Sequence, residues 1–208
     1  KEVLGKKYLL PAHQGRACEN IIAKAFIKPG QIVLTNYHFT TTLAHITEMG
    51  GKVIELLHDE ALELESSNPF KGNIDIDKLV AAIEENGAQN IAFIRMEAST
   101  NLIGGQPFSI INMMDVRKVA DQYNIMLVLD ASLLGENAYL VKQREEKWKE
   151  NTMADIVKMM TGLADLVYFS ARKLTSSRGG GICTNVRELY MTMEPLIPLF
   201  EGFLTYGG

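Results

Sequence analysis

Short apolar runs alternate with longer segments in which apolar residues recur at helical spacing. The short runs are rich in Val, Ile and Leu and predict buried strands, which lie at 8–10, 31–35, 52–57, 90–94, 125–129, 166–169 and 181–184. The longer segments predict helices, which lie at 16–27, 40–49, 75–86, 109–123, 138–149, 152–162 and 186–200.

Strands that alternate with helices are joined by right-handed crossovers, which give a largely parallel sheet with helices on both faces. The sequence contains neither an internal repeat nor a low-complexity linker. We therefore predict one α/β domain over residues 1–208. In such sheets ligands bind outside the carboxyl ends of the strands, so the residues that follow each strand are the candidates for a functional site.

The composition narrows the class of protein. With 47% hydrophobic and 22% charged residues, the chain is typical of a soluble globular domain. Its formal net charge of -4 gives no electrostatic reason to expect nucleic acid or a membrane as a partner. No run approaches the roughly 18 apolar residues of a membrane span, and the first residues do not form a signal peptide.

Cysteine and histidine usage gives two further expectations. Two cysteines, Cys18 and Cys183, do not make a disulfide framework, so we expect a reducing, cytoplasmic location. The histidines show no zinc-type spacing with cysteines or carboxylates, so no metal site is predicted; they are His13, His38, His45 and His58.

The first strand is followed by Gln14, Gly15 and Arg16, which lie where the next helix begins. Backbone N–H groups and the helix dipole favour an anion at such a position, and an arginine adds a charged fork for phosphate or carboxylate. The alternative is a helix start with an exposed arginine. The chain contains no Gly-x-Gly-x-x-Gly or Walker sequence, so the dinucleotide and triphosphate fingerprints are absent.

Three more candidates follow later strands. Phe39 lies in a segment of aromatic and hydroxyl residues that could be a helix cap with buried rings or a stacking platform for a planar ligand. Asn101, before the Gly104–Gly105 turn, could cap the next element or donate to a ligand oxygen. Asp130 ends a buried strand, and a buried carboxylate needs a cation; a protonated ring nitrogen and an internal Arg or Lys are equally suitable partners.

The strand at 166–169 leads into Ser170, Arg172 and Lys173, and glycines follow at 179–181. A basic, solvated turn is one interpretation of this stretch. The other is a lysine that forms a covalent link to a carbonyl. Taken together, the candidates match the parts of pyridoxal phosphate. An anion site suits its phosphate, an aromatic side chain its planar ring and an amide donor its ring oxygen. A carboxylate suits its ring nitrogen, and the lysine amine suits its aldehyde.

The order of the motifs resembles the β-eliminating lyases, the family of tryptophanase and tyrosine phenol-lyase. The resemblance runs through nearly the whole chain in colinear order. The segments that carry it are His13–Arg16, Phe39–Thr42, Gly104–Ser109, Asp130–Ser132, Glu136–Tyr139, Lys142–Glu145 and Glu201–Gly208.

This resemblance implies the aspartate-aminotransferase-like large domain of fold type I, a three-layer α/β structure with pyridoxal 5'-phosphate. It implies that Gln14, Gly15, Arg16 and Ser170 bind the phosphate and that Phe39 stacks on the ring. It further implies that Asn101 contacts the ring hydroxyl, that Asp130 holds the ring nitrogen protonated and that Lys173 holds the cofactor covalently. Two neighbours complete the predicted cofactor-binding set, Ser132 after Asp130 and Arg172 in the place of a family lysine.

The implied activity is β-elimination on an aromatic L-amino acid, giving indole from tryptophan or phenol from tyrosine, with pyruvate and ammonia. Lys173 and Asp130 are the implied catalytic residues. The family also implies a homo-oligomer, a dimer or tetramer, with potassium in the full-length protein. We expect the chain to be an incomplete large domain, with an N-terminal segment and a C-terminal small domain outside it, and expect the isolated fragment to be inactive.

One departure from the family pattern leaves other functions open. Leu133 stands where the family has an arginine, three residues after the aspartate that pairs with the cofactor ring. Losing that cation would alter the surroundings of the cofactor. A cysteine-type β-lyase, an aldolase or a transaminase on the same fold is therefore an alternative, since a fold alone does not fix chemistry. A non-catalytic, truncated or degenerate domain is the other.

Overall fold

A computed structural model describes residues 2–174 and 177–202 of the chain. Within these residues, seven strands form one sheet in the order β1-β7-β6-β5-β4-β2-β3. The strands are β1 (Tyr8–Ala12), β2 (Ile32–Thr35), β3 (Lys52–Glu55), β4 (Ile91–Glu97), β5 (Leu127–Asp130), β6 (Leu166–Ser170) and β7 (Gly180–Thr184). β7 runs antiparallel to both of its neighbours, and the other adjacent pairs are parallel.

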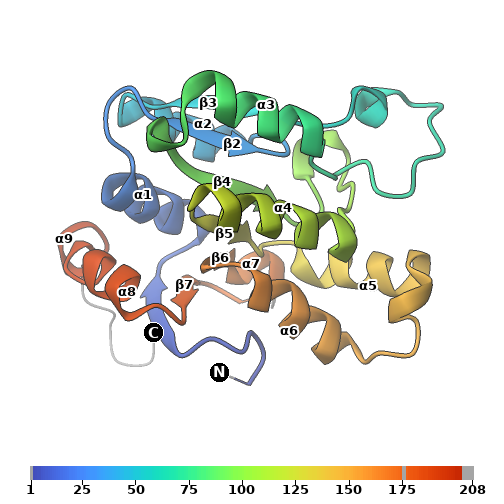
Figure 1. The fold of residues 1–208 in the computed structure, drawn as a ribbon. Helices are drawn as coiled ribbons and strands as arrows, with labels where there is room; N and C mark the ends of the chain where they lie inside the picture. The colour runs from blue at the N-terminus through green and yellow to red at the C-terminus, as the bar shows by residue number, and fades with distance from the viewer. Residues whose placement is uncertain (1, 175–176, 203–208) are drawn as a thin grey trace.

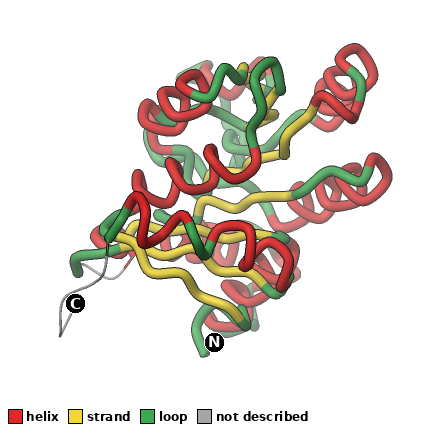
Figure 2. Tube along the Cα trace, turned by 90° about the vertical axis from the view of Figure 1, so that its left-hand side faces the viewer, coloured by secondary structure: helices red, strands yellow, loops and turns green. Residues whose placement is uncertain are grey.

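Helices cover both faces of the sheet, so the predicted three-layer α/β class is confirmed (Figure 1, Figure 2). One face packs against α3 (Ile76–Asn86), α4 (Ile110–Tyr123), α5 (Leu134–Arg144) and α6 (Met153–Leu163). The other face packs against α1 (Gly15–Phe26), α2 (Thr40–Glu48), α8 (Arg187–Met193) and α9 (Leu196–Phe200). A short helix, α7 (Ala171–Leu174), follows β6 directly.

The strand register brings the chain segments of the predicted site to one edge of the sheet. Glu97 at the end of β4 lies opposite Asp130, and Asp130 lies opposite Tyr168 of β6. Ser170, the last residue of β6, lies opposite Gly180, the first residue of β7. Because parallel strands end at the same edge, residues that are far apart in sequence come together there.

Several helix starts are set by side chains that accept hydrogen bonds from otherwise unpaired N–H groups. Asp75 caps α3, Ser109 caps α4, and Thr152 forms a capping box at the start of α6. The start of α1 differs, because Gln14 makes no side-chain cap. The first turn of α1 therefore presents its backbone donors at the sheet edge.

Most predicted elements lie within one or two residues of the observed ones, but β4 extends three residues beyond the predicted 90–94 and two helix predictions are wrong. The segment 186–200 is two helices, α8 and α9, because Pro195 lacks the N–H group that a continuous helix needs at that position. The helix predicted at 138–149 begins earlier, at Leu134, and ends at Arg144. Leu134 and Asn137 are fully buried in this first turn, so tertiary packing extends the helix.

The Glu201–Gly208 motif lies mostly outside the described residues, because its part from 203 to 208 is not described. Within residues 2–174 and 177–202, no helix has the length and apolar character needed to cross a bilayer.

The tight crossing of β7 past the start of α1 gives a test of the fold. A Cβ atom at Gly180 would lie 2.7 Å from the carbonyl carbon of Gln14 and 2.8 Å from the backbone oxygen of Phe169. We expect Gly180→Ala to lower the free energy of unfolding by about 1–3 kcal/mol, because backbone on both sides must shift. Urea denaturation measures this difference.

Gly162→Ala is the matched control, since a Cβ at this position of α6 meets nothing within 4 Å. Alanine is the better helix former, so this variant should gain about 0.5–1 kcal/mol. Equal stability of the two variants would contradict the observed packing at the start of β7.

Candidate active site

A cleft of about 280 Å³ opens at the carboxyl edge of the sheet, at the small end of the ~300–1,000 Å³ that ligand sites span. Nine of the ten predicted cofactor-binding residues line it. Its lining residues are Gln14, Gly15, Arg16, Glu19, Phe39, Thr41, Asp130, Ser132, Ser170, Arg172 and Lys173. The structure thus brings together residues in or next to α1, α2, β5, β6 and α7, which the sequence separates by up to 159 positions, the interval from Gln14 to Lys173.

The start of α1 forms the anion-attracting part of the cleft. Gly15 lies so close to β6 that a Cβ on it would be 3.0 Å from the Cβ of Ser170. Glycine therefore lets the uncapped helix start approach the end of β6 closely. Arg16 adds a permanent positive charge to the same lining. This donor set suits a phosphate or a carboxylate.

The amine of Lys173 lies beside an aromatic ring. Its Nζ is 4.7 Å from the centre of the Phe39 ring, and both residues line the cleft. Phe39 immediately precedes α2, whereas Lys173 lies in α7. The sequence predicted that this lysine would lie at the end of a strand or in a loop. In the structure it lies in α7, three residues beyond the end of β6.

Asp130 is tied to the protein through both oxygens. It is 5% exposed. Its Oδ2 accepts hydrogen bonds from Arg95 Nη2 at 2.7 Å and from the Tyr168 hydroxyl at 2.9 Å. Its Oδ1 accepts from the backbone N–H of Ser132 at 3.0 Å. Of the partners that the sequence left open for Asp130, the structure supplies an internal arginine.

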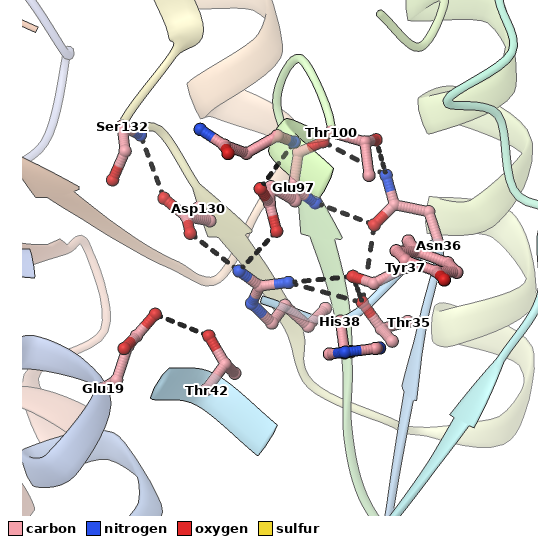
Figure 3. Close-up of polar contacts among 12 residues, drawn as sticks. Glu19, Thr35, Asn36, Tyr37, His38, Thr42, Glu97, Thr100, Asp130 and Ser132 are labelled. Carbon is pink, nitrogen blue, oxygen red and sulfur yellow. Dashed lines mark hydrogen bonds and ion pairs between the residues drawn. The ribbon is translucent and has the colours of Figure 1, made fainter. Parts of the chain in front are cut away.

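Arg95, on β4, was not predicted as a site residue. It is 1% exposed, and its fork of N–H groups is fully engaged. Nη2 donates to Glu97 and Asp130, and Nε donates to the Tyr168 oxygen at 2.9 Å. Nη1 donates to Thr35 Oγ1 and the carbonyl of Tyr37. Figure 3 shows Glu97 and Asp130 approaching this group from neighbouring strands.

Glu19 of α1 completes this buried set. It accepts hydrogen bonds from the hydroxyls of Thr41 and Thr42, each at 2.5 Å, and lies 3.4 Å from the Tyr168 hydroxyl. We call Glu19, Arg95, Glu97, Asp130 and Tyr168 the Arg95 cluster. The sequence carried one signal for it, since Arg95 and Glu97 alternate with apolar residues in a strand that is otherwise apolar.

The Arg95 cluster has more acidic groups than basic ones. Three carboxyl groups, of Glu19, Glu97 and Asp130, share the charge of one guanidinium. Burial raises the pKa of Glu19, and the negative charge of Asp130 raises it further. Burial also raises the pKa of Glu97, although Arg95 opposes this. A further proton or cation beside these groups is therefore electrostatically favoured.

Ser132 and Asn101 occupy different environments. Ser132 lines the cleft, and its hydroxyl accepts a hydrogen bond from the backbone N–H of Ser170 at 3.1 Å. Asn101 is the one predicted cofactor-binding residue outside the lining. Its backbone N–H donates to Glu97 Oε1 at 2.9 Å. Leu133 immediately precedes α5.

Comparison with known proteins adds an independent line of evidence. The model of one family, described as beta-eliminating lyase, matches residues 1–193. The chain belongs to this beta-eliminating lyase family. It is 41% identical to the tyrosine phenol-lyase of Pasteurella multocida and 40% identical to that of Fusobacterium nucleatum, in each case over the whole chain. The chain spans 46% and 45% of the lengths of these two relatives.

A solved structure supports the fold. NtdA from Bacillus subtilis, determined with bound cofactor PMP, superposes with a TM-score of 0.60 at 21% identity. The match covers 94% of this chain and 37% of that one. At this identity the likeness shows the fold alone, and it agrees with the predicted class.

The stability of the chain should depend on the ionisation of Glu19. The pKa of this carboxyl is raised in the folded chain, above the value of about 4.3 expected for a glutamate in the unfolded chain. Between the two values the folded state binds more protons, so the free energy of unfolding falls as the pH rises through that window. Its total fall is about 1.4 kcal/mol for each unit by which the pKa is raised.

Glu19→Gln removes this titration while it keeps the shape of the side chain. We therefore expect the variant to lose less stability than the wild type as the pH rises from about 4 to neutral. Urea denaturation of both proteins across this range measures the difference. Parallel stability curves would show that Glu19 ionises in the folded chain as it does in the unfolded one.

Proposed function

We propose that the protein containing this chain is a pyridoxal-phosphate-dependent lyase that removes the aromatic side chain of an L-amino acid by β-elimination. Tyrosine is the substrate we favour, with phenol, pyruvate and ammonia as products, because the relatives are tyrosine phenol-lyases. The observation that carries the proposal is the 4.7 Å approach of the Lys173 amine to the Phe39 ring, in a cleft that also holds Arg16 and Asp130.

The residues of the cleft suit the parts of this cofactor. The uncapped start of α1, with Gln14, Gly15, Arg16 and Ser170, would bind the phosphate. The close approach at Gly15 supports this assignment, since a larger residue would press against Ser170, the other residue of this set that lies beside it. Phe39 would stack on the flat ring. Asp130 would accept a hydrogen bond from the ring nitrogen.

Lys173 would hold the cofactor covalently and, once displaced by substrate, would move a proton at the substrate Cα. When bound, pyridoxal phosphate supplies an electron sink for the negative charge that develops at this carbon. Ser132 and Arg172 line the same cleft and would orient Ser170 and the cofactor phosphate, respectively. A contact of Asn101 with the ring hydroxyl is not included, because this residue lies outside the lining.

The family resemblance supports three further proposals for the whole protein. We propose that the protein acts as a homo-oligomer, that it uses potassium and that it works in the cytoplasm. Leu133 cannot supply the cation that the family pattern places there. A β-lyase acting on cysteine is therefore the second candidate function, and substrate tests separate the two.

The proposed activity is tested on the full-length gene product with pyridoxal phosphate. We expect phenol and pyruvate from tyrosine at a higher rate than pyruvate from cysteine or serine. Lys173→Ala should lower this rate by at least about 100-fold, because it removes the group that transfers the proton. It should also abolish the visible absorbance band of the bound cofactor.

Lys118→Ala is the control, because Lys118 lies on the exposed surface of α4 and pairs with Asp115. This variant should keep both the band and the rate. Faster pyruvate release from cysteine than from tyrosine would favour the second candidate. A band that persists unchanged in Lys173→Ala would refute the role of this lysine.

A further inference from the structure

The hydrogen bonds on Asp130 restrict what a ligand can reach. Each carboxylate oxygen has two lone-pair positions for strong hydrogen bonds. On Oδ2 these are taken by Arg95 and by the Tyr168 hydroxyl. On Oδ1 one is taken by the backbone N–H of Ser132. One position therefore remains for a ligand, and it lies on Oδ1.

Arg95 also fixes the orientation of the carboxyl group. The guanidinium cannot shift toward another partner without breaking its bonds to Tyr168, Glu97 and the β2 end. Tyr168 has a single hydroxyl proton, which it donates to Asp130, while its oxygen accepts from Arg95 Nε. Asp130 is thus held from two directions in one rotamer, before any ligand binds.

The charge of Arg95 acts on a second cation at the same carboxylate. A carboxylate that is already paired with a guanidinium attracts another positive charge less strongly than a free one. Arg95 does not itself line the cleft, whereas Asp130 does. Charged and titratable groups surround Asp130 from α1, β4, β6 and the cleft wall: Glu19, Arg95, Glu97, Tyr168, Arg16, Arg172 and Lys173.

We propose that Arg95 is a positioning residue that presents Asp130 Oδ1 to the cofactor ring nitrogen and weakens the hold of Asp130 on the ring proton. This inference rests on the proposed function. Its consequence is that the bound ring gives up its proton at a lower pH than it would opposite a carboxylate without an arginine partner. Arg95, on the buried strand β4, would therefore influence how strongly the cofactor ring withdraws electrons, because it changes the pH at which the ring nitrogen loses its proton.

The test measures the protonation of the cofactor ring nitrogen directly. The full-length gene product is loaded with pyridoxal phosphate carrying ¹⁵N in the ring, and the ¹⁵N chemical shift is followed against pH without substrate. In Arg95→Met/Glu97→Gln the guanidinium is removed without leaving Glu97 unpaired. We expect the pKa of the ring nitrogen to rise by about 1 in this variant. Arg95→Lys keeps the positive charge, so the pKa of the ring nitrogen in this variant should stay close to that in the wild type.

Two further variants make the experiment decisive. Arg117→Met is the matched control, because it breaks an arginine pair with Asp165 outside the cleft, near Leu127 at the start of β5 and thus at the opposite end of that strand from Asp130. It should leave the ring titration unchanged. Tyr168→Phe removes the other hydrogen bond on Oδ2 without changing the charge, so it should raise the ring pKa by a smaller amount. If Arg95→Met/Glu97→Gln does not fold, the shift of the ring pKa in Tyr168→Phe tests the proposal instead.

The outcomes separate the two proposals. If the ring titrations of Arg95→Met/Glu97→Gln and of Tyr168→Phe coincide with that of the wild type, with the cofactor bound at Lys173, the role of Arg95 is overturned and the proposed function stands. A wild-type protein that holds no pyridoxal phosphate overturns both. A rise that also occurs in Arg117→Met overturns the specific role of Arg95, because loss of another arginine ion pair would then have the same effect.

Discussion

The ion pair between Arg95 and Asp130 joins the parts of the protein that must stay in register for a site to exist. A guanidinium on β4 holds a carboxylate on β5, and Tyr168 extends the contact to β6. Removing one partner of such a buried pair typically costs about 3–5 kcal/mol, because a charge is left without compensation. The carboxyl ends of three strands are therefore fixed in relation to one another.

The cleft that results combines a group of residues that attracts negative charge with a group that attracts positive charge. The uncapped start of α1 and Arg16 attract negative charge, whereas the carboxyl-rich Arg95 cluster attracts a proton or a cation. Lys173 and Phe39 contribute an amine and a flat ring to the same space. This polarity suits a ligand with a phosphate and a protonated ring, and membership of the beta-eliminating lyase family is consistent with such a ligand.

The strand and helix pattern, and with it the edge where the site lies, could be predicted from the sequence because period and turn signals are local. Most of the cleft followed from the same reasoning, since Asp130 ends a strand and Gly15 and Lys173 each lie three residues beyond one. Arg95 and Glu97 could not be assigned in this way, because their importance depends on which strands become neighbours. The early start of α5 and the position of Asn101 likewise depend on tertiary contacts.

Binding of pyridoxal phosphate in this cleft through a covalent bond to Lys173 can be tested directly. The full-length protein is incubated with pyridoxal phosphate, reduced with borohydride and digested, and the modified peptide is identified by mass spectrometry. We expect the reduced phosphopyridoxyl group on Lys173. A modification on a different lysine, or none, would contradict this expectation.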